Sequence, residues 1–101
     1  MNIFTPKQLV PAGSEEIETL LESRNVIIER ILSNRLEKSE WFNQSEDEWV
    51  VLLRGSAVME FDDQSEVLLG AGDYLYIPAH QRHRILHTSD DTLWLAIHIK
   101  T

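Results

Sequence analysis

From about residue 36 onward, the chain consists of short apolar segments that are each closed by turn-forming residues. Gly55 separates one pair of segments, and Asp62-Asp63-Gln64-Ser65 forms a turn between the next pair. Many short strands with a turn signal about every eight to twelve residues are typical of a β-sandwich or a β-barrel. The sequence therefore predicts an all-β fold, with strands at 49–53, 57–61, 67–69, 74–77, 82–88 and 93–100.

The N-terminal quarter has a different pattern. Residues 1–11 carry short apolar patches followed by prolines, so we expect an extended arm that lies on the body. Ser14 is a suitable helix cap, and acidic residues follow it in the first turn, so a short helix is expected after Gly13. Residues 25–32 allow two interpretations, a continuation of this helix or a strand. The β-branched run Val26-Ile27-Ile28 favours the strand.

In the last two predicted strands, the alternation of side chains between the two faces of the sheet predicts which face each histidine occupies. In 82–88, His83 and His87 fall on one face and the arginines on the other. In 93–100, His98 shares a face with Trp94 and is best interpreted as a core histidine. A histidine at a strand mouth is partly hydrated, so we expect removal of His83 to disturb the fold less than removal of His98.

Three of the four histidines lie between positions 80 and 87, where a proline-stopped strand gives way to a loop and then to the next strand. Imidazoles at strand ends are common metal ligands and general bases. The competing interpretation is a polar, solvated loop. The stretch contains His80, His83 and His87, together with Arg82 and Arg84 and no carboxylate.

Composition excludes several classes of protein. Because the chain has no cysteine, disulfides, thiolate metal sites and cysteine catalysis are excluded, and any metal needs His, Asp, Glu or amide ligands. The net charge of −8 disfavours nucleic acid and anionic membranes as partners. No apolar run has the length of a membrane span or a signal peptide, so we expect a cytoplasmic protein.

Two glycine-anchored stretches together resemble the cupin superfamily. In the second cupin motif, G-x5-P-x-G-x2-H-x3-N, three positions match with Gly72, Pro78 and His83. His80 stands at the position of the motif glycine, and His87 stands at the position of the asparagine.

In the first motif, G-x5-H-x-H-x3,4-E-x6-G, Glu48 and Gly55 match the second half. The two motif histidines would fall on Trp41 and Asn43 with one spacing, or on Phe42 and Gln44 with the other. The resemblance covers roughly residues 26–100. It implies a single cupin domain over 1–101, with an arm and short helix at 1–24 and a jelly-roll β-barrel at 26–100.

Cupins hold a divalent metal in the barrel mouth on three histidines and a glutamate. Carried over residue by residue, the resemblance implies Glu48 and His83 as metal ligands, with His80 or the amide oxygen of Gln44 or Asn43 as a third. The metal would be iron, manganese, nickel or zinc. His80 or His87 would then move protons near neutral pH. The implied function is binding of a metal and a small polar molecule, with dioxygenase-like or isomerase-like chemistry.

Two other functions remain open at this stage. One is a metal-free module that binds a small anion through the His/Arg cluster. The other is a structural or regulatory subunit that uses only the exterior of the barrel. Separately, Glu48 could form a purely structural ion pair with Arg82 or Arg84. The closing strand is apolar on both faces over much of its length, so we also expect a homodimer.

Overall fold

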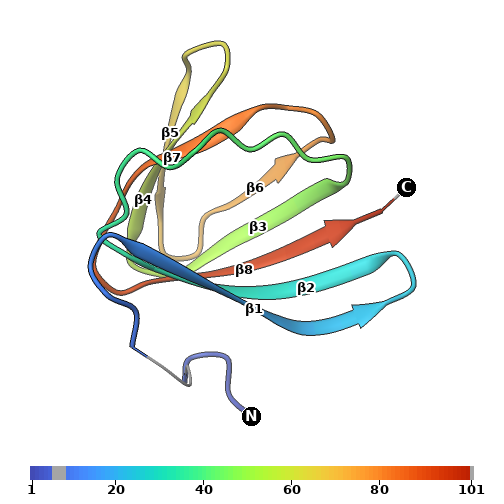
Figure 1. Ribbon diagram of the computed structural model, residues 1–101, viewed down its shortest axis with the longest axis horizontal. Helices are drawn as coiled ribbons and strands as arrows, with labels where there is room; N and C mark the ends of the chain where they lie inside the picture. The colour runs from blue at the N-terminus through green and yellow to red at the C-terminus, as the bar shows by residue number, and fades with distance from the viewer. Residues whose placement is uncertain (6–8, 101) are drawn as a thin grey trace.

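The computed structural model describes residues 1–5 and 9–100 of the chain, and within them it contains β-strands and no α-helix. The strands form two antiparallel sheets, one in the order β1-β2-β8-β3-β6 and the other in the order β5-β4-β7 (Figure 1). The all-β fold and each strand expected after residue 25 are confirmed. The strands are β1 (Ser14–Ser23), β2 (Val26–Asn34), β3 (Asp47–Arg54), β4 (Ser56–Phe61), β5 (Glu66–Gly70), β6 (Tyr74–Ile77), β7 (His83–Thr88) and β8 (Thr92–Ile99).

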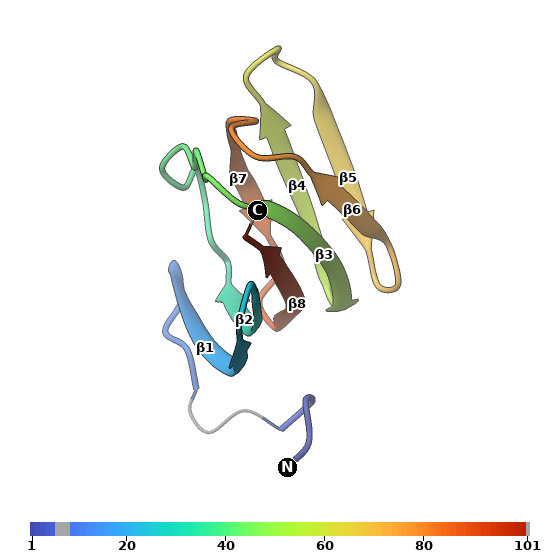
Figure 2. The ribbon, with the colours of Figure 1, turned by 90° about the vertical axis from the view of Figure 1, so that its right-hand side faces the viewer.

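The two sheets face each other and enclose one hydrophobic core, with the β1–β2 hairpin extending away from β5 (Figure 2). Alternation along each strand sends every second side chain inward. In β3, for example, Glu48, Val50 and Leu52 are buried. The core contains Val50, Leu52, Ala57, Met59, Phe61, Leu69, Ile77, Ile85, Trp94 and Ala96. Among the described residues, no helix is long and apolar enough to cross a membrane.

The prediction of a helix after Gly13 is wrong, because this segment is strand β1. It pairs antiparallel with β2 from Ser14↔Asn34 to Ser23↔Val26. The glutamates that suggested a helix start instead alternate between the two faces of a sheet edge. Backbone pairing with β2 satisfies a full ladder of N–H and C=O groups, and this tertiary gain outweighs a weak local helix preference.

The segment between β2 and β3 covers the edge of β7. Lys38 and Ser39 donate backbone hydrogen bonds to Leu86 and Ile85, at 3.1 and 2.8 Å. Phe42 and His83 exchange both backbone hydrogen bonds, at 2.7 and 3.1 Å. This segment therefore protects an exposed strand edge and fixes its own side chains against β7.

A β-bulge in β7 changes the predicted face of His87. Val58 pairs with His87 and Met59 pairs with Ile85, so Leu86 is an extra residue in the ladder. His87 is consequently exposed, whereas His83 and Ile85 face inward. The expectation that His83 and His87 share a face is wrong, because simple alternation does not include a bulge. In β8, Trp94 and His98 both face the interior, as alternation predicts.

The outer face of the larger sheet carries an apolar row across all five strands. Cross-strand pairing aligns its members: Leu21 with Ile28, Ile28 with Ile97, Ile97 with Trp49, and Trp49 with Tyr76. We call these five residues the outer apolar row. Leu21 and Tyr76 at its ends are 51% and 54% exposed.

Arg30 holds part of the expected N-terminal arm against the same face. Arg30 is 5% exposed, and its guanidinium donates hydrogen bonds to the carbonyl oxygens of Asn2, Ile3 and Thr5. It also forms an ion pair with the Glu18 carboxylate. The arm is thus attached by a buried charge that is paired, as burial of a charge requires.

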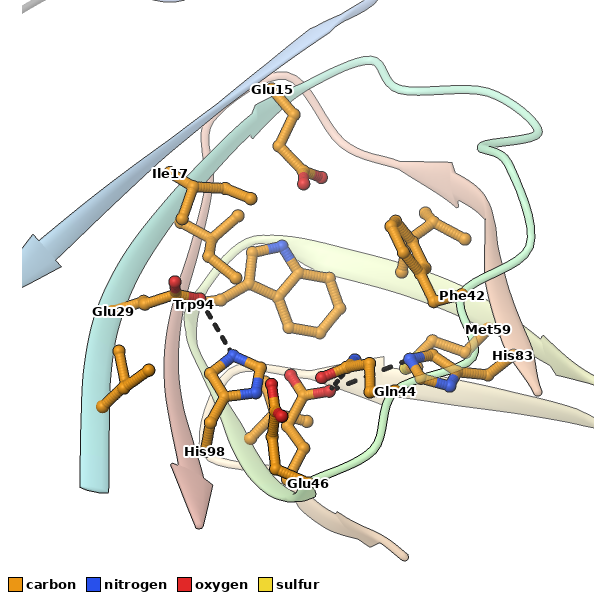
Figure 3. A pocket seen from close by; sticks show the side chains of 15 residues that line it. Glu15, Ile17, Glu29, Phe42, Gln44, Glu46, Met59, His83, Trp94 and His98 are labelled. Atoms are coloured by element: carbon orange, nitrogen blue, oxygen red, sulfur yellow. Dashed lines mark hydrogen bonds and ion pairs between the residues drawn. The ribbon is translucent and has the colours of Figure 1, made fainter. Parts of the chain in front are cut away.

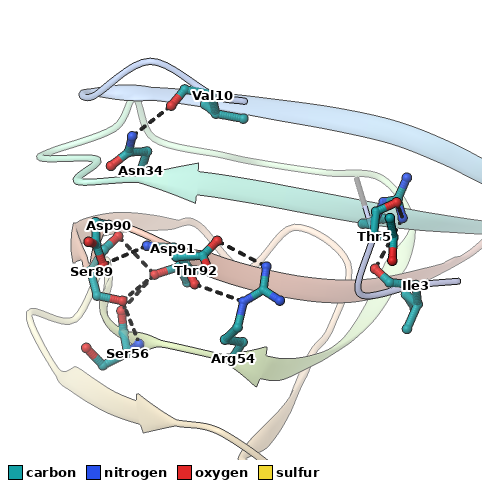
Figure 4. A network of polar contacts seen from close by, with 11 residues as sticks. Ile3, Thr5, Val10, Asn34, Arg54, Ser56, Ser89, Asp90, Asp91 and Thr92 are labelled. Atoms are coloured by element: carbon teal, nitrogen blue, oxygen red, sulfur yellow. Dashed lines mark hydrogen bonds and ion pairs between the residues drawn. The ribbon is translucent and has the colours of Figure 1, made fainter. Parts of the chain in front are cut away.

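Gly55 sits in the tight turn between β3 and β4 and cannot accept a side chain. Its φ is +92°, and an added Cβ would lie 2.6 Å from Ser89 Oγ and 2.8 Å from Thr92 Oγ1. Those hydroxyls contact each other and Ser56 in a polar network (Figure 4). We predict that Gly55→Ala destabilises the fold by roughly 3 kcal/mol, from backbone strain plus overpacking.

Gly72→Ala is the matched control, since Gly72 has the same φ of +92° and no atom within 4 Å of an added Cβ. It should lose only about 1–2 kcal/mol for the left-handed backbone. Thermal unfolding of both variants measures the difference. Equal losses would show that the contact with Ser89 and Thr92 does not limit this turn.

Candidate functional site

A cavity of about 260 Å³ lies between the sheets, lined by side chains from β1, β2, β3, β4, β7 and β8 and from the segment before β3. Its walls are apolar, with Trp94, Phe42 and several aliphatic residues, but many polar groups converge in it (Figure 3). A largely apolar pocket with a few convergent polar groups is the usual form of a small-molecule site. The polar lining residues are Glu15, Glu29, Gln44, Glu46, Glu48, His83 and His98.

Glu48 and His83 form a buried pair in this cavity. Glu48 is 7% exposed and His83 is 4% exposed. His83 Nδ1 lies 3.0 Å from the Gln81 carbonyl oxygen, which can only accept, so Nδ1 carries the proton. His83 Nε2 therefore faces Glu48 Oε1 at 3.8 Å, which is too long for a hydrogen bond.

The structure decides between the two spacings of the first motif. Phe42 and Gln44 line the cavity, whereas Trp41 and Asn43 do not. Gln44 Nε2 donates a 2.9 Å hydrogen bond to Glu48 Oε1, and the Phe42 ring lies 5.6 Å from the His83 ring. The two positions that carry histidines in the motif thus hold an aromatic wall and an amide.

His83 is more enclosed than expected. Phe42 and Phe61 flank its ring, with ring centroids at 5.6 and 6.2 Å. The expectation of a partly hydrated histidine at the strand mouth is therefore wrong. Loop 35–46 and β4 close over this end of β7, which the sequence of the strand itself does not reveal.

His80 and His87 do not join this pair. Both are exposed, and neither lines the cavity. The His80 backbone N–H donates to the Gln44 carbonyl at 2.7 Å, with φ at +66°, so this residue shapes the turn that positions Gln44. Of the sequence-derived site residues, the structure brings together Glu48, His83 and Gln44.

A second imidazole–carboxylate pair lines the cavity, and the sequence analysis did not identify it as a site. His98 Nε2 lies 2.9 Å from Glu29 Oε1, and His98 Nδ1 is buried without a hydrogen-bond partner. His98 is the direct cross-strand partner of Glu48. The available signal was the alternation in β2, which sets Glu29 on the same face as Ile27 and Ile31.

Glu15 adds a third carboxylate at the β1 side. Burial raises the pKa of Glu15, and the nearby Glu48 and Glu29 carboxylates act in the same direction. A hydrogen bond from Ser33 Oγ to Glu15 Oε2, at 3.1 Å, opposes that rise in pKa. Ser33 Oγ in turn accepts from Trp94 Nε1 at 3.2 Å.

Arg82 and Arg84 lie outside the cavity, in agreement with the alternation that places them on the face opposite to His83. The guanidinium carbons of Arg82 and Arg84 lie 5.1 and 4.5 Å from the Trp41 ring centre, and Arg84 forms a 2.7 Å ion pair with Glu60. The alternative that pairs Glu48 with Arg82 or Arg84 is therefore wrong. No arginine or lysine lines the cavity within the described chain, which removes the cations that a small-anion site needs.

The cavity offers an incomplete set of donors for a divalent metal. In residues 1–5 and 9–100, no three His, Cys, Asp or Glu side chains are arranged to hold an ion. Glu48 and His83 supply two donors, and Gln44 can supply an amide oxygen as the third if its amide turns over. His83 also has the orientation of a metal ligand, with one ring nitrogen donating to a carbonyl and the other directed at the site.

Comparisons with known proteins agree with the motifs. The family model described as a cupin domain matches residues 33–98. A crystal structure from Ralstonia eutropha JMP134, of a protein provisionally named a mannose-6-phosphate isomerase, is 38% identical, with a TM-score of 0.86. The match covers 100% of this chain and 97% of that one. A search of curated proteins found no match.

More distant structures share the fold alone. KdgF from Halomonas sp. is 16% identical, with a TM-score of 0.81 over 100% of this chain and 93% of that one. A cupin from Methanocaldococcus jannaschii with a double-stranded β-helix fold is 19% identical, with a TM-score of 0.72 over 88% and 82% of the two chains.

The raised pKa of Glu15 predicts a pH-dependent effect of Glu15→Gln. Because the folded-state pKa lies above the unfolded one, Glu15 favours folding at acidic pH, and this contribution is lost as pH rises through the folded pKa. At pH 8 the partly buried Glu15 carboxylate is close enough to Glu29 and Glu48 to be repelled by them, whereas glutamine keeps an acceptor for Ser33. The variant should therefore melt higher than wild type at pH 8, and not below about pH 4.

Melting curves in the presence of a chelator measure this effect. Glu16→Gln is the control, since Glu16 adjoins Glu15 in β1 but does not line the cavity. A Glu15→Gln variant less stable than wild type at pH 8 would contradict the prediction.

Proposed function

Because the chain belongs to the cupin family, we propose that its cavity binds a divalent metal ion and a small polar molecule. Glu48, His83 and Gln44 are the proposed protein ligands. The observation that carries the proposal is the orientation of His83. Its Nδ1 proton is held by the Gln81 carbonyl, so Nε2 presents a lone pair toward the Glu48 carboxylate at 3.8 Å.

A lone pair that faces a carboxylate at this distance is unfavourable unless a positive charge lies between them. Either a proton or a metal cation supplies that charge. The cavity strongly favours a cation, because four glutamates and no arginine or lysine line it in the described chain. Three protein ligands also leave positions for a water or a small molecule, as in catalytic metal sites.

Each of the three residues has a defined part in this arrangement. Glu48 supplies the negative charge, and the neutral imidazole of His83 supplies a fixed nitrogen donor. Gln44 gives up its hydrogen bond to Glu48 and turns its amide oxygen inward. A bound divalent ion would polarise a carbonyl or enediol oxygen of the ligand. Phe42 and Trp94 supply aromatic walls for the bound molecule.

The proposed chemistry is isomerase-like, and dioxygenase-like chemistry is the second possibility. The provisional isomerase name of the Ralstonia protein supports the first. Only the reaction class is transferred here, because a phosphorylated substrate would place its negative charge among the cavity glutamates. His80 and His87 are exposed, which does not support a proton-transfer role for either of them in the cavity.

A metal-free binding protein is the alternative function. It is favoured by Phe42, which occupies a motif histidine position and packs on His83, and by the hydrogen bond that Gln44 already makes to Glu48. In that case the charge between Glu48 and His83 is a proton.

We predict that calorimetric titration with iron(II), manganese, nickel or zinc shows one site that binds at least one of these ions tighter than about millimolar. Glu48→Gln should weaken binding at least about tenfold, since it removes the charged ligand and keeps the side-chain shape. His83→Ala should do the same, but it also opens space between two phenylalanines, so Glu48→Gln is the primary test.

His87→Ala is the matched control, because this exposed histidine belongs to the same strand and lies outside the cavity. It should bind metal as wild type does. If no ion binds tighter than about millimolar, the metal proposal fails and the metal-free alternative replaces it.

We also propose that the chain forms a homodimer through the outer apolar row. This row crosses the whole five-stranded sheet, and the flanking Tyr74 is 68% exposed. A second copy would cover the row by an isologous contact, which pairs the same surface on both subunits.

Light scattering at about 50 µM should give the mass of a dimer for wild type. Tyr76→Lys adds a charge at the exposed end of the row and should shift the mass toward the monomer. Leu68→Lys is the control, because Leu68 is 75% exposed on β5 of the other sheet. A wild-type monomer, or equal effects of both variants, would contradict this interface.

A further inference from the structure

The geometry points to a cationic amine as the ligand of the cavity, with its ammonium group held by Glu15 and Glu29 against the Trp94 ring. This subsite lies beside the Glu48–His83 pair and belongs to β1, β2 and β8. It deepens the proposed function by naming a ligand class for the same cavity, and it does not depend on whether a metal is bound.

The side-chain N–H donors named for this cavity are already engaged within the protein, and the remaining nitrogens, His98 Nδ1 and His83 Nε2, present lone pairs. Trp94 Nε1 donates to Ser33, and Gln44 Nε2 donates to Glu48. His98 Nε2 contacts Glu29, and His83 Nδ1 contacts a carbonyl. A ligand therefore meets mainly carboxylate oxygens, which accept hydrogen bonds. The oxygens of a phosphate or a carboxylate ligand are hydrogen-bond acceptors and could not pair with the carboxylates of the cavity, whereas an ammonium group supplies three donors.

The charges of the lining residues also favour a cationic ligand. Glu15, Glu29, Glu46 and Glu48 line one cavity, and among the described residues the only other titratable groups there are His83 and His98. Even with a divalent ion at Glu48, no lysine or arginine of the described chain lines the cavity beside Glu15 and Glu29. Carboxylates that crowd together in a partly buried space repel one another, and a cation between them relieves that repulsion.

The position of Trp94 completes the subsite. Figure 3 shows Glu15 and Glu29 on two sides of the Trp94 indole. Because the indole N–H is taken by Ser33, the ring offers its face to a ligand, and that face attracts cations. A cavity of about 260 Å³ suits a small amine and not a large one.

His98 holds Glu29 in place for this task. Its ring is 12% exposed and reaches Glu29 Oε1 at 2.9 Å, while Nδ1 stays buried with no partner. A buried nitrogen without a hydrogen-bond partner is energetically unfavourable. If His98 served packing alone, an apolar side chain would fill its position without an unsatisfied nitrogen. The histidine is therefore better explained as a residue that orients Glu29, whose carboxylate contacts the ligand.

Three probes of similar size and different charge test the proposal: ethanolamine, ethylene glycol and glycolate. Each is added at equal ionic strength, with a chelator present so that an amine–metal complex cannot contribute. Ethanolamine should raise the melting temperature of the wild-type protein in a concentration-dependent way. Ethylene glycol and glycolate should not do so, because one lacks the charge and the other has the wrong sign.

The variants place the effect within the cavity. Glu29→Gln should weaken the apparent affinity for ethanolamine at least tenfold, while Glu16→Gln, outside the cavity, should leave it unchanged. Glu48→Gln should retain most of the ethanolamine response although it loses metal affinity, which separates this proposal from the metal proposal. Circular dichroism checks that each variant is folded.

Several outcomes would overturn the amine assignment. Stabilisation by ethylene glycol equal to that by ethanolamine would show a neutral polar ligand class, and stabilisation by glycolate would show an anion site. No response to ethanolamine, or a full response in Glu29→Gln, would remove the subsite altogether.

Discussion

The pairing of β8 with both β2 and β3 is the constraint on which the rest of this structure depends. Strand β8 joins an N-terminal hairpin to a strand from the middle of the chain, and so makes one five-stranded sheet. Its register sets Glu48 directly opposite His98 and places Glu29 within reach of the same ring. A slip by one residue would turn all these side chains to the outer face and exchange them for the outer apolar row.

The cavity combines two imidazole–carboxylate pairs that have different surroundings. His83 is fixed from behind by a carbonyl and directs its free nitrogen at Glu48, which is the arrangement of a metal ligand. His98 instead contacts Glu29 through Nε2, and its Nδ1 has no hydrogen-bond partner. The first pair uses positions of the family motifs, and the second is a feature of this chain outside those motifs.

The segment before β3 explains how a cupin can lack the histidines of its first motif and still form a cavity between its sheets. It pairs with β7 as an irregular edge, so Phe42 and Gln44 replace two ligands with a wall and an amide. The cavity is lined by carboxylates without arginines, because the arginines of β7 and its preceding loop point outward and stack on Trp41. Ligand chemistry in this cavity is therefore set by carboxylates and aromatic faces.

The sequence by itself determined the all-β class, the positions of the strands after residue 25 and the placement of Glu48 and His83 in one site. Those features depend on local alternation, on turn residues and on motif spacing, and each of these signals is contained in a short segment of the sequence. The strand in place of a helix at Ser14–Ser23, the outward turn of His87 and the enclosure of His83 were decided by tertiary structure. So was the Glu29–His98 pair, whose members lie 69 residues apart. Each of these depends on which strand pairs with which, and in what register, and that choice is made by long-range backbone hydrogen bonds and not by any single segment.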